Sequence, residues 1–358
     1  MTVIAPQPAQ FDCYVNAVPV FAEEALARLY GHVSSSMPYF RVFKSFANVS
    51  TYVTRNEDRV TCVLLFERHH GRVQVLNEGI GIDQQTIDQF AQRIFHKFPD
   101  VDLICFNQIE TLVTDLSFPF QIHEVTENYI VPLPPTPMAY TSALGNATRR
   151  NIKRYMRKLL EDQPSFICRF FSGAQIERQH FATLLQMSEA KVLQKKGRFS
   201  IDPAYAEGLW KLARQSGFVS VAMVDGKVCA GLICFQVQSY YFAHVVAHDS
   251  AYDGYGLGIL CCYLTMCEAI RRGGTVFNMG QLHYHYKVRL LASRHHLDRI
   301  VIYRSYQSGI GHAGCVLKML AGKRIRNLKS WLLQHPDSMM ARSAKYLLYR
   351  AHQLRSRG

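Results

Sequence analysis

The stretch from Tyr240 to Leu291 constrains the fold most, because strand, turn and helix signals follow one another there without a break. An aromatic strand-like run ends at His248, an apolar helix-like segment covers 259–270, and a short strand covers 275–279. Glycines stand at alternate positions in the loop before this helix: Gly254, Gly256 and Gly258. Such a loop leaves backbone N–H groups and the positive end of the helix dipole open to a phosphate. Alternate glycines also suit a plain tight turn, so the pattern leaves both interpretations open.

Helix and strand signals also alternate along residues 1–135, which predicts an α/β unit there. The expected helices cover 22–30 and 86–98, and the expected strands cover 60–66, 72–76, 101–106 and 128–133, after an irregular lead-in to about residue 18. The proline-rich segment 131–137 is the expected domain boundary.

Beyond this boundary the alternation continues to residue 310. We expect helices over 140–160, 175–196 and 203–216, a strand over 166–171, a three-strand meander over 219–224, 228–237 and 240–247, and a last strand over 296–303. The pair Asp225-Gly226 is a favoured two-residue hairpin turn, which supports the meander. Two basic helices, 312–334 and 338–353, are expected to follow. The expected domains are therefore 1–135, 136–310 and a basic helical C-terminal extension, 311–358.

The net charge of +14 is concentrated in two segments. Residues 311–358 carry ten Lys and Arg against the single acid Asp337, and the run Arg149–Lys158 adds six basic residues. Localised positive charge suits an anionic ligand, an acidic protein, nucleic acid or a membrane surface. A solvated helix face is the alternative for either segment. The helix 338–353 either lies on an anionic membrane or packs on the domain and exposes its basic side.

The ten cysteines show no spacing typical of a zinc site, and we expect no metal. Cys261, Cys262 and Cys267 lie in the apolar helix-like segment, which indicates thiols of a core. The N-terminus lacks the regions of a signal peptide, and no apolar run approaches the roughly 20 residues that a spanning helix needs. These features favour a cytoplasmic protein, with peripheral membrane contact through the C-terminal helices as an option.

Four segments between about 140 and 305 together resemble the GNAT acyltransferase superfamily. They are Thr148–Arg154, the hairpin Val224–Gly231, the loop Asp249–Gly258, and Phe277-Asn278-Met279-Gly280 ahead of Tyr286-Lys287. More closely, they resemble the CelD-like, or BioF-associated, acetyltransferase branch, which is related to Fem-type peptidoglycan aminoacyltransferases. The resemblance implies an α/β (α+β) fold with two GNAT-like halves in tandem, mixed central sheets and flanking helices. It also implies transfer of an acyl group from acyl-CoA or an acyl carrier protein.

Three side chains are the candidate catalytic residues: His244, His248 and Tyr286. Strand alternation places Phe242, His244, Val246 and His248 on one face, so both imidazoles are expected to face the reaction centre. An imidazole is the natural base near neutral pH. The resemblance places Tyr286 where it would protonate the leaving thiolate or orient the acceptor. The structural alternatives are hydrogen-bonded or solvent-facing histidines and a tyrosine packed on a helix.

The donor phosphates are expected on the loop Gly254–Gly258, with Arg149 and Arg150 of the basic helix and with Lys287. A solvated helix face and a solvated lysine are the alternatives. Asp249 and Glu189 are the candidate acceptor-binding acids, although Asp249 would alternatively cap the loop through an Asx-type hydrogen bond. This sequence departs from the superfamily pattern at Asp253, where the loop usually has Gln or Arg.

These features support three functions. The leading one is an N- or O-acyltransferase that uses acyl-CoA, or an acyl carrier protein, and an amino sugar, an amino acid or a polysaccharide precursor as acceptor. The second is a Fem-type aminoacyltransferase that uses aminoacyl-tRNA, which the basic clusters favour. The third is a non-catalytic protein on the same fold that docks an acidic carrier protein or a membrane through its basic C-terminus.

Overall fold

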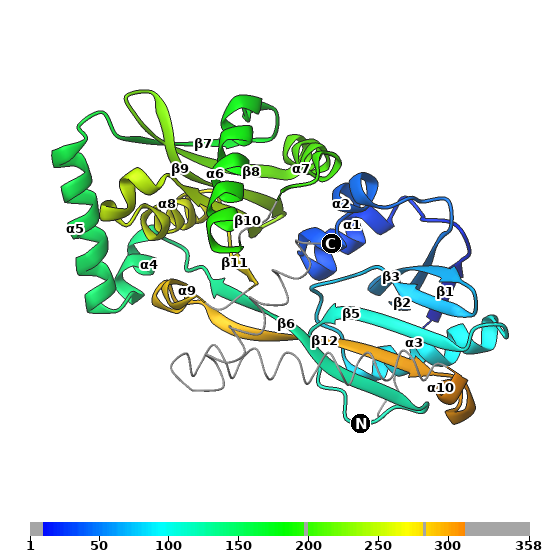
Figure 1. The fold of residues 1–358 in the computed structure, drawn as a ribbon. Coiled ribbons are helices and arrows are strands. Elements are labelled where there is room, and N and C mark those ends of the chain that lie inside the picture. Colours follow the sequence, from blue (N-terminus) through cyan, green and yellow to red (C-terminus); the bar gives the residue numbers. More distant parts are fainter. Residues whose placement is uncertain (1–9, 197–199, 282–283, 312–358) are drawn as a thin grey trace, which may run out of the picture.

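The computed structural model describes residues 10–196, 200–281 and 284–311 (Figure 1). The two helices expected over 312–334 and 338–353 lie outside the described residues. No helix in the described ranges is long and apolar enough to cross a membrane.

Twelve strands of the described chain form one mixed sheet that runs through both halves of the molecule (Figure 1). In spatial order they are β1 (Gln10–Tyr14), β2 (Val49–Asn56), β3 (Arg59–His69), β4 (Arg72–Val75), β5 (Leu103–Ile109), β12 (Ser293–Tyr303), β6 (Phe120–Pro132), β11 (Val276–Gln281), β10 (Tyr240–His248), β9 (Lys227–Val237), β8 (Gly217–Val224) and β7 (Ile167–Ser172).

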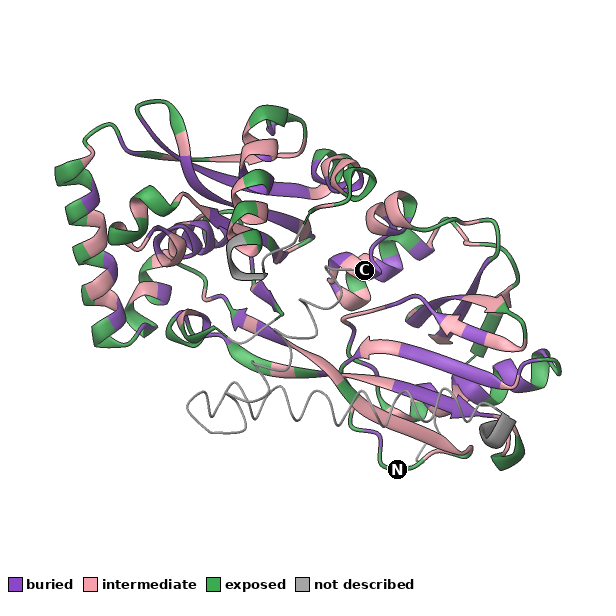
Figure 2. Cartoon of the chain, viewed as in Figure 1, coloured by how far each residue is buried: buried purple, intermediate pink, exposed green. Residues whose placement is uncertain are grey.

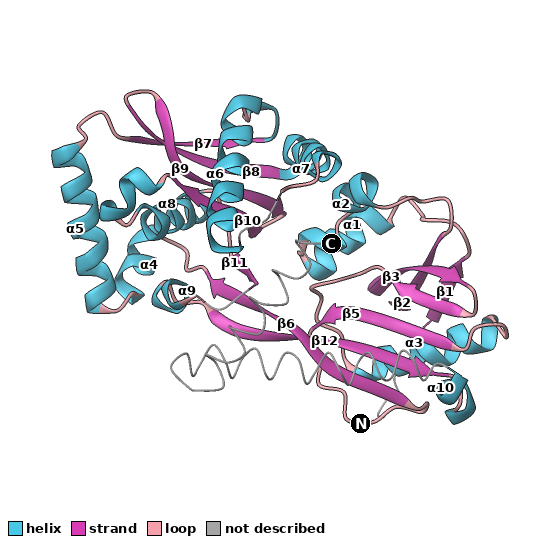
Figure 3. Cartoon of the chain, viewed as in Figure 1, coloured by secondary structure: helices cyan, strands magenta, loops and turns pink. Residues whose placement is uncertain are grey.

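Helices flank this sheet in each half, as Figure 3 shows. They are α1 (Ala22–Tyr30), α2 (Met37–Phe43), α3 (Gln84–Lys97), α4 (Pro137–Ala143), α5 (Asn146–Asp162), α6 (Arg178–Lys196), α7 (Pro203–Ser216), α8 (Leu257–Arg271), α9 (His285–Arg289) and α10 (Tyr306–Gly311), with short 3₁₀ segments η1 (Val33–Ser35), η2 (Gly173–Gln175) and η3 (Ser250–Tyr255).

The two halves repeat one topology. Strands β1 to β4 are antiparallel neighbours, and β5 then pairs with β4 in parallel. Strands β7 to β10 are likewise antiparallel neighbours, and β11 pairs with β10 in parallel. A parallel pair needs a crossover connection, which α3 supplies in the first half and α8 in the second. The expected α/β fold with tandem halves is therefore confirmed, and the two halves share one continuous sheet.

Strands β6 and β12 are exchanged between the halves. Strand β6 follows β5 in the chain but pairs with β11, whereas β12 follows β11 but pairs with β5. The exchanged strands also pair with each other, antiparallel, from Ser293 opposite Ile130 to Ile302 opposite Phe120. The end of β6 near residue 132 therefore separates the halves along the chain but not within the sheet.

Both faces of the first half carry a buried core. Phe90 of α3 packs on one face, while Leu26 of α1 and Phe40 of α2 pack on the other. Neighbouring residues of β2 serve opposite faces, since Tyr52 joins the cluster under α3 and Val53 joins the cluster under α1. Figure 2 shows the resulting pattern, with buried strands inside and exposed helix surfaces outside.

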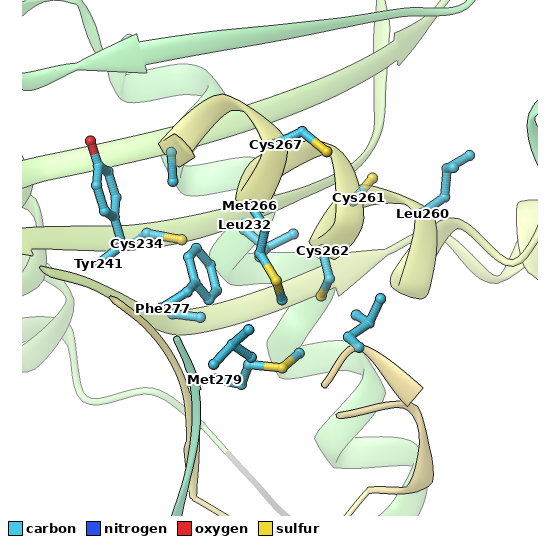
Figure 4. Close-up of a cluster of buried hydrophobic side chains, with 14 of the residues drawn as sticks. Leu232, Cys234, Tyr241, Leu260, Cys261, Cys262, Met266, Cys267, Phe277 and Met279 are labelled. Carbon is cyan, nitrogen blue, oxygen red and sulfur yellow. The ribbon is translucent and has the colours of Figure 1, made fainter. Parts of the chain in front are cut away.

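Helix α8 is the buried helix of the second half. Its thiols, Cys261, Cys262 and Cys267, are buried in the core, as expected from the apolar segment. In Figure 4 they lie beside Met266 and near Tyr241 of β10 and Phe277 of β11. A helix that is apolar on all sides must be covered on all sides, and here the sheet, α4 and α5 cover it. Helices α6 and α7 pack on the opposite face of the same strands.

The helix expected over 140–160 is in fact two helices, α4 and α5. Leu144 has an extended ψ of 143°, and Gly145 begins α5 as its N-cap residue. The break lets Tyr140, which is fully buried, donate its hydroxyl to the Leu290 carbonyl at 3.0 Å. Burial of Tyr140 therefore overrides the continuous helical periodicity.

Five further elements were not predicted from the sequence: β1, β2, α2, α9 and α10. Strand β1 lies in the segment expected to be an irregular lead-in, and it forms the edge of the sheet by pairing with β2. Its strand state depends on this partner, because its residues are mostly exposed and show no buried alternation.

Gly231 of β9 is expected to tolerate no side chain. A Cβ atom there would lie 2.2 Å from the Ser220 carbonyl oxygen and 2.9 Å from a methyl group of Leu184. We expect Gly231→Ala to lower the free energy of unfolding by about 1–3 kcal/mol through overpacking. Gly81→Ala is the matched control, since a Cβ atom there meets nothing within 4 Å. Urea unfolding measures both, and equal stability of the two variants would contradict this account of the close approach.

Candidate active site

The parallel pairing of β10 with β11 ends early. It covers only Tyr240 to Phe242 opposite Val276 to Asn278. Beyond it, β10 has a bulge between Ala243 and Val245, and β11 reaches Gly280, whose φ is +72°. A Cβ atom at Gly280 would lie 3.2 Å from the Ala243 carbonyl oxygen, so a glycine suits this position. The strands then diverge, and a cavity of about 580 Å³, the first cavity, opens beside them.

The bulge in β10 corrects the expected alternation of this strand. Phe242 packs with the cluster under α6 and α7, whereas Val246 packs with the cluster under α8. A bulge inserts one extra residue and therefore moves the following side chains to the other face. The expectation that Phe242 and Val246 share a face is thus wrong, although His244 and His248 both line the first cavity.

The first cavity has walls from both faces of the sheet. Its lining comprises Ala243, His244, Val246 and His248 of β10, Met279 to Gln281 of β11, Ser188, Lys191 and Val192 of α6, Asp253 and Gly256 to Ile259 of the loop and α8, and Tyr284, Tyr286 and Lys287 around α9. Among the described residues, no group of three or more His, Cys, Asp or Glu side chains is arranged to hold a metal ion.

His248 is held between a cation and an anion. Its Nδ1 lies 3.2 Å from Lys191 Nζ, and its Nε2 lies 2.9 Å from Asp253 Oδ1. A lysine ammonium only donates and a carboxylate only accepts, so these contacts fix the neutral ring with its proton on Nε2. Burial and then the charge of Lys191 lower the pKa of His248, and the hydrogen bond to Asp253 opposes them. His248 is therefore neutral at physiological pH, with both nitrogens engaged inside the protein.

His244 lies where the first cavity meets a second one. Its Nε2 lies 3.2 Å from the hydroxyl of Tyr205 on α7. Desolvation by the surrounding protein lowers the pKa of His244. The side chain is nevertheless exposed, which limits this effect. His244 is thus a neutral imidazole in contact with the cavity space.

Lys287 is a buried cation at the edge of the first cavity. Only 2% of it is exposed, and its Nζ donates to the carbonyls of Gly280 at 3.0 Å and Gln281 at 2.7 Å. Burial lowers the pKa of Lys287 to about 8, so the ammonium form is the main one at pH 7. The alternative of a solvated lysine is ruled out by this burial. Instead, Lys287 fixes the end of β11 and places positive charge where the two strands diverge.

Tyr286 also lines the first cavity and is half-buried. Its ring stacks on that of Tyr284 with the centroids 5.9 Å apart. Burial raises the pKa of Tyr286, so its hydroxyl stays protonated and can donate a hydrogen bond or a proton.

The three loop glycines have different roles. Gly256 has a left-handed φ of +61°, and a Cβ atom there would lie 2.8 Å from the Tyr155 ring. A Cβ atom added at Gly258 would make only an ordinary van der Waals contact with His248. One added at Gly254 would lie near Lys158 Nζ alone, at 3.8 Å. Gly256 and Gly258 line the first cavity at the start of α8, and Gly254 does not.

Besides Gly254, four predicted binding residues lie outside the lining of the first cavity. Arg149 hydrogen-bonds the Ser142 carbonyl and the Asn146 side chain, and Arg150 is exposed near the start of α5. Asp249 Oδ1 accepts the Ala251 N–H at 2.9 Å, which is the Asx-type cap that the sequence offered as its alternative role. Glu189 Oε1 accepts the Ile201 N–H at 2.9 Å.

The second cavity, of about 330 Å³, lies between the two halves. Val33, Ser34, Tyr39, Glu78 and Gln108 line it from the first half, and Tyr205, Leu209, Leu212, Phe235, Phe242, Ala243, His244, Gly280 and Gln281 line it from the second. Four of these residues, Ala243, His244, Gly280 and Gln281, also line the first cavity. The two cavities therefore meet at the bulge of β10.

Sequence reasoning missed several of these residues, namely Lys191, Asp253 as a partner of His248, Tyr205 and Glu78. The role of Asp253 was indicated in the sequence, because an acidic residue in a loop expected to bind phosphate needs a nearby partner for its charge. The others lie on separate elements that only the folded chain brings together.

Replacing Gly256 tests the loop geometry. We expect Gly256→Ala to cost roughly 1–2 kcal/mol in stability because of its left-handed backbone, with a further cost from the contact with Tyr155. Gly254→Ala is the matched control, since its Cβ position is open, and it should leave the melting temperature unchanged. A melting curve without a difference between the two variants would argue against a required glycine at 256.

The contacts of His248 predict opposite pKa changes in two variants. Lys191→Met removes a cation that lowers the pKa of His248, so this pKa should rise. Asp253→Asn removes the anion that raises it, so the pKa should fall further. NMR titration of the His248 ring protons measures both, with exposed His96 as an internal reference. Shifts in the same direction would contradict the arrangement.

Comparison with known proteins gives this geometry a context. Residues 146–288 match the family model described as the acetyltransferase (GNAT) domain. The crystal structure of FemX covers 81% of this chain and 96% of its own, at 9% identity and a TM-score of 0.59. L-PGS from Bacillus licheniformis covers 80% and 92% at 15% identity and 0.47, and a tandem GNAT protein from the clavulanic acid biosynthesis pathway covers 81% and 98% at 11% identity and 0.40. No curated protein sequence matches the chain significantly.

The matched segment includes every residue that lines the first cavity. The similarity to FemX extends over both halves and, at this identity, concerns the fold. Residues 146–288 are therefore similar to a GNAT acetyltransferase domain, within a tandem fold similar to that of FemX.

Proposed function

We propose that the protein is an acyltransferase of the CelD-like branch that moves an acyl group from acyl-CoA, or from an acyl carrier protein, to an amine or hydroxyl. The acceptor classes are an amino sugar, an amino acid or a polysaccharide precursor. One observation carries the proposal: the first cavity joins the glycine loop to a space that contains His244, Tyr286 and the buried Lys287 ammonium.

The donor side is the loop and the start of α8. The first N–H groups of a helix have no partner within the helix and carry partial positive charge, which suits a phosphate. Gly256 and Gly258 keep side chains away from these groups. From there the first cavity leads past β10 to Lys287, so an extended donor arm would bring its thioester to the point where the strands diverge.

The reaction then needs three proton and charge adjustments. The acceptor attacks the thioester carbon, a C–N or C–O bond forms, and the C–S bond breaks. His244 takes the acceptor proton, since both nitrogens of His248 are engaged. The Lys287 ammonium stabilises the negative charge on the carbonyl oxygen, and such stabilisation is strong in a buried site. Tyr286 gives its proton to the leaving thiolate and recovers one from solvent.

A Fem-type aminoacyltransferase is the second candidate, favoured by the charge around the loop. Asp249 and Asp253 belong to the loop, and Asp162 accepts the Tyr255 hydroxyl at 3.1 Å. Three carboxylates weaken the attraction for a pyrophosphate at this point. They favour a donor whose phosphates lie elsewhere, such as aminoacyl-tRNA on the exposed basic face of α5.

Donor binding distinguishes the two candidates. Under the first, CoA and acetyl-CoA bind the full chain in calorimetry, and a thiol-detecting assay records release of free CoA. Under the second, CoA does not bind, whereas tRNA binds with an affinity that falls steeply with salt. Binding of neither, with no thioester turnover, would overturn the proposal that the protein is a transferase.

The two histidines should differ in their effect on turnover. We expect His244→Gln to lower kcat by about 10²–10⁴-fold, the usual contribution of a general base, with little change in donor affinity. His248→Gln should cost less, because its ring contacts Lys191 and Asp253 rather than the acceptor. His96→Gln, at an exposed position on α3, is the control. A larger loss in His248→Gln than in His244→Gln would reverse the two assignments.

A further inference from the structure

The second cavity carries a charge that the proposed reaction does not use. Among the described residues that line it, Glu78 is the only acid, and none is Lys or Arg. A carboxylate in a cavity of this kind attracts a cation and repels a carboxylate or phosphate.

The position of Glu78 is fixed through its backbone. The Glu78 N–H donates to Ser35 Oγ at 2.9 Å, and the Ser35 hydroxyl donates back to the Glu78 carbonyl at 2.8 Å. The next residue, Gly79, has a φ of +71° and packs so tightly on the His32 ring that a Cβ atom would lie 2.3 Å from it. These contacts use none of the Glu78 side-chain oxygens.

The Glu78 carboxylate has no hydrogen bond or ion pair with any described residue at the distances that define one. Burial raises its pKa, and the more distant charge of Lys44 opposes that effect. Glu78 in turn helps to raise the pKa of neighbouring Tyr39 to about 12, after burial, the largest cause. A half-buried carboxylate without a partner is costly, so a cationic ligand would gain by pairing with it.

The rest of the lining suits the organic part of such a ligand. Leu209, Leu212 and Phe235 are apolar, while Tyr39 and Tyr205 present aromatic rings that attract an ammonium group. A volume of about 330 Å³ lies at the small end of ligand pockets. The cavity thus fits a compact, mainly aliphatic cation.

We infer that the second cavity binds a small primary amine in its ammonium form, without an acid group, and that Glu78 selects this acceptor class. The inference rests on the proposed function only in naming the amine as the acyl acceptor. His244 lines both cavities, so it lies where the second cavity meets the donor side of the first. The ammonium loses one proton to solvent, and the free amine attacks the thioester carbon. A C–N bond forms, the nitrogen gives its second proton to His244, and the C–S bond breaks as Tyr286 protonates the leaving thiolate.

Calorimetry with four probes of similar length tests the selection without any donor: 1,5-diaminopentane, pentylamine, 5-aminopentanoate and 1-pentanol. Wild-type protein should bind the two acid-free amines at least about tenfold tighter than the other two, as expected for a charge-assisted contact. Glu78→Gln should lose about 10–100-fold for the amines and little for 1-pentanol. Glu24→Gln, at an exposed position on α1, is the control and should bind like wild type.

Glu78→Lys adds a reversal that loss of folding cannot imitate. It should bind 5-aminopentanoate more tightly than 1,5-diaminopentane. Equal amine affinity in wild type and Glu78→Gln, or no amine binding to wild type, would overturn the inference. If amines bind in a way that depends on Glu78 but no acyl transfer occurs, the inference stands and the proposed function is rejected. If acyl groups are transferred to alcohols or acidic amines without any effect of Glu78, the proposed function stands and the inference is rejected.

Discussion

Strand β6 belongs to the first half along the chain but pairs with β11 of the second half, and β12 belongs to the second half but pairs with β5 of the first. Because β6 and β12 also pair with each other, each has a partner on both of its edges. Backbone N–H and C=O groups along both edges are thereby satisfied, so the halves cannot part without exposing two ladders of unpaired groups. The exchange fixes β5 of one half relative to β11 of the other. Gln281 of β11 donates its amide to Gln108 of β5 at 2.8 Å, across the point where the two cavities meet. Gln108 has a left-handed φ of +49°, a strained backbone state held in place by the paired strands around it.

The charges of the cavities follow from this rigid frame. Lys287 is buried because the end of β11 offers it two carbonyl acceptors, and its positive charge then faces the point of strand divergence. Asp253, which departs from the usual phosphate loop, is paired with His248 and so belongs to the network that includes Lys191. On the other side of the bulge, Glu78 is the one acidic side chain among the described residues that line the second cavity. The two cavities therefore carry opposite charges, positive at Lys287 and negative at Glu78.

Local signals predicted much of the fold. The bounds of α1 and α7 match the expected helices, because their apolar periodicity and terminal residues are local properties. The hairpin turn at Asp225-Gly226 has the positive φ values at both residues that such a turn needs. The glycine loop, the buried thiols of α8 and the placement of His244, His248, Tyr286 and Lys287 beside one cavity were also within reach. The bulge of β10, the break before α5 and the edge strand β1 were not, since each depends on a partner distant in the sequence.

The sequence by itself determined the α/β class, the loop before α8 and the region of the candidate site, because these depend on local periodicity, turn chemistry and motif spacing. The tandem halves were implied by the resemblance of four segments to the GNAT superfamily. Only the tertiary structure decided which side chains meet. It engaged both nitrogens of His248, buried Lys287 and gave Asp249 and Glu189 hydrogen-bonding roles within the protein. It also placed Glu78 of the first half and His244 of the second in the lining of one cavity. The physical reason is that pairing across exchanged strands, and the diverging strands beside them, are set by contacts between residues far apart in the chain.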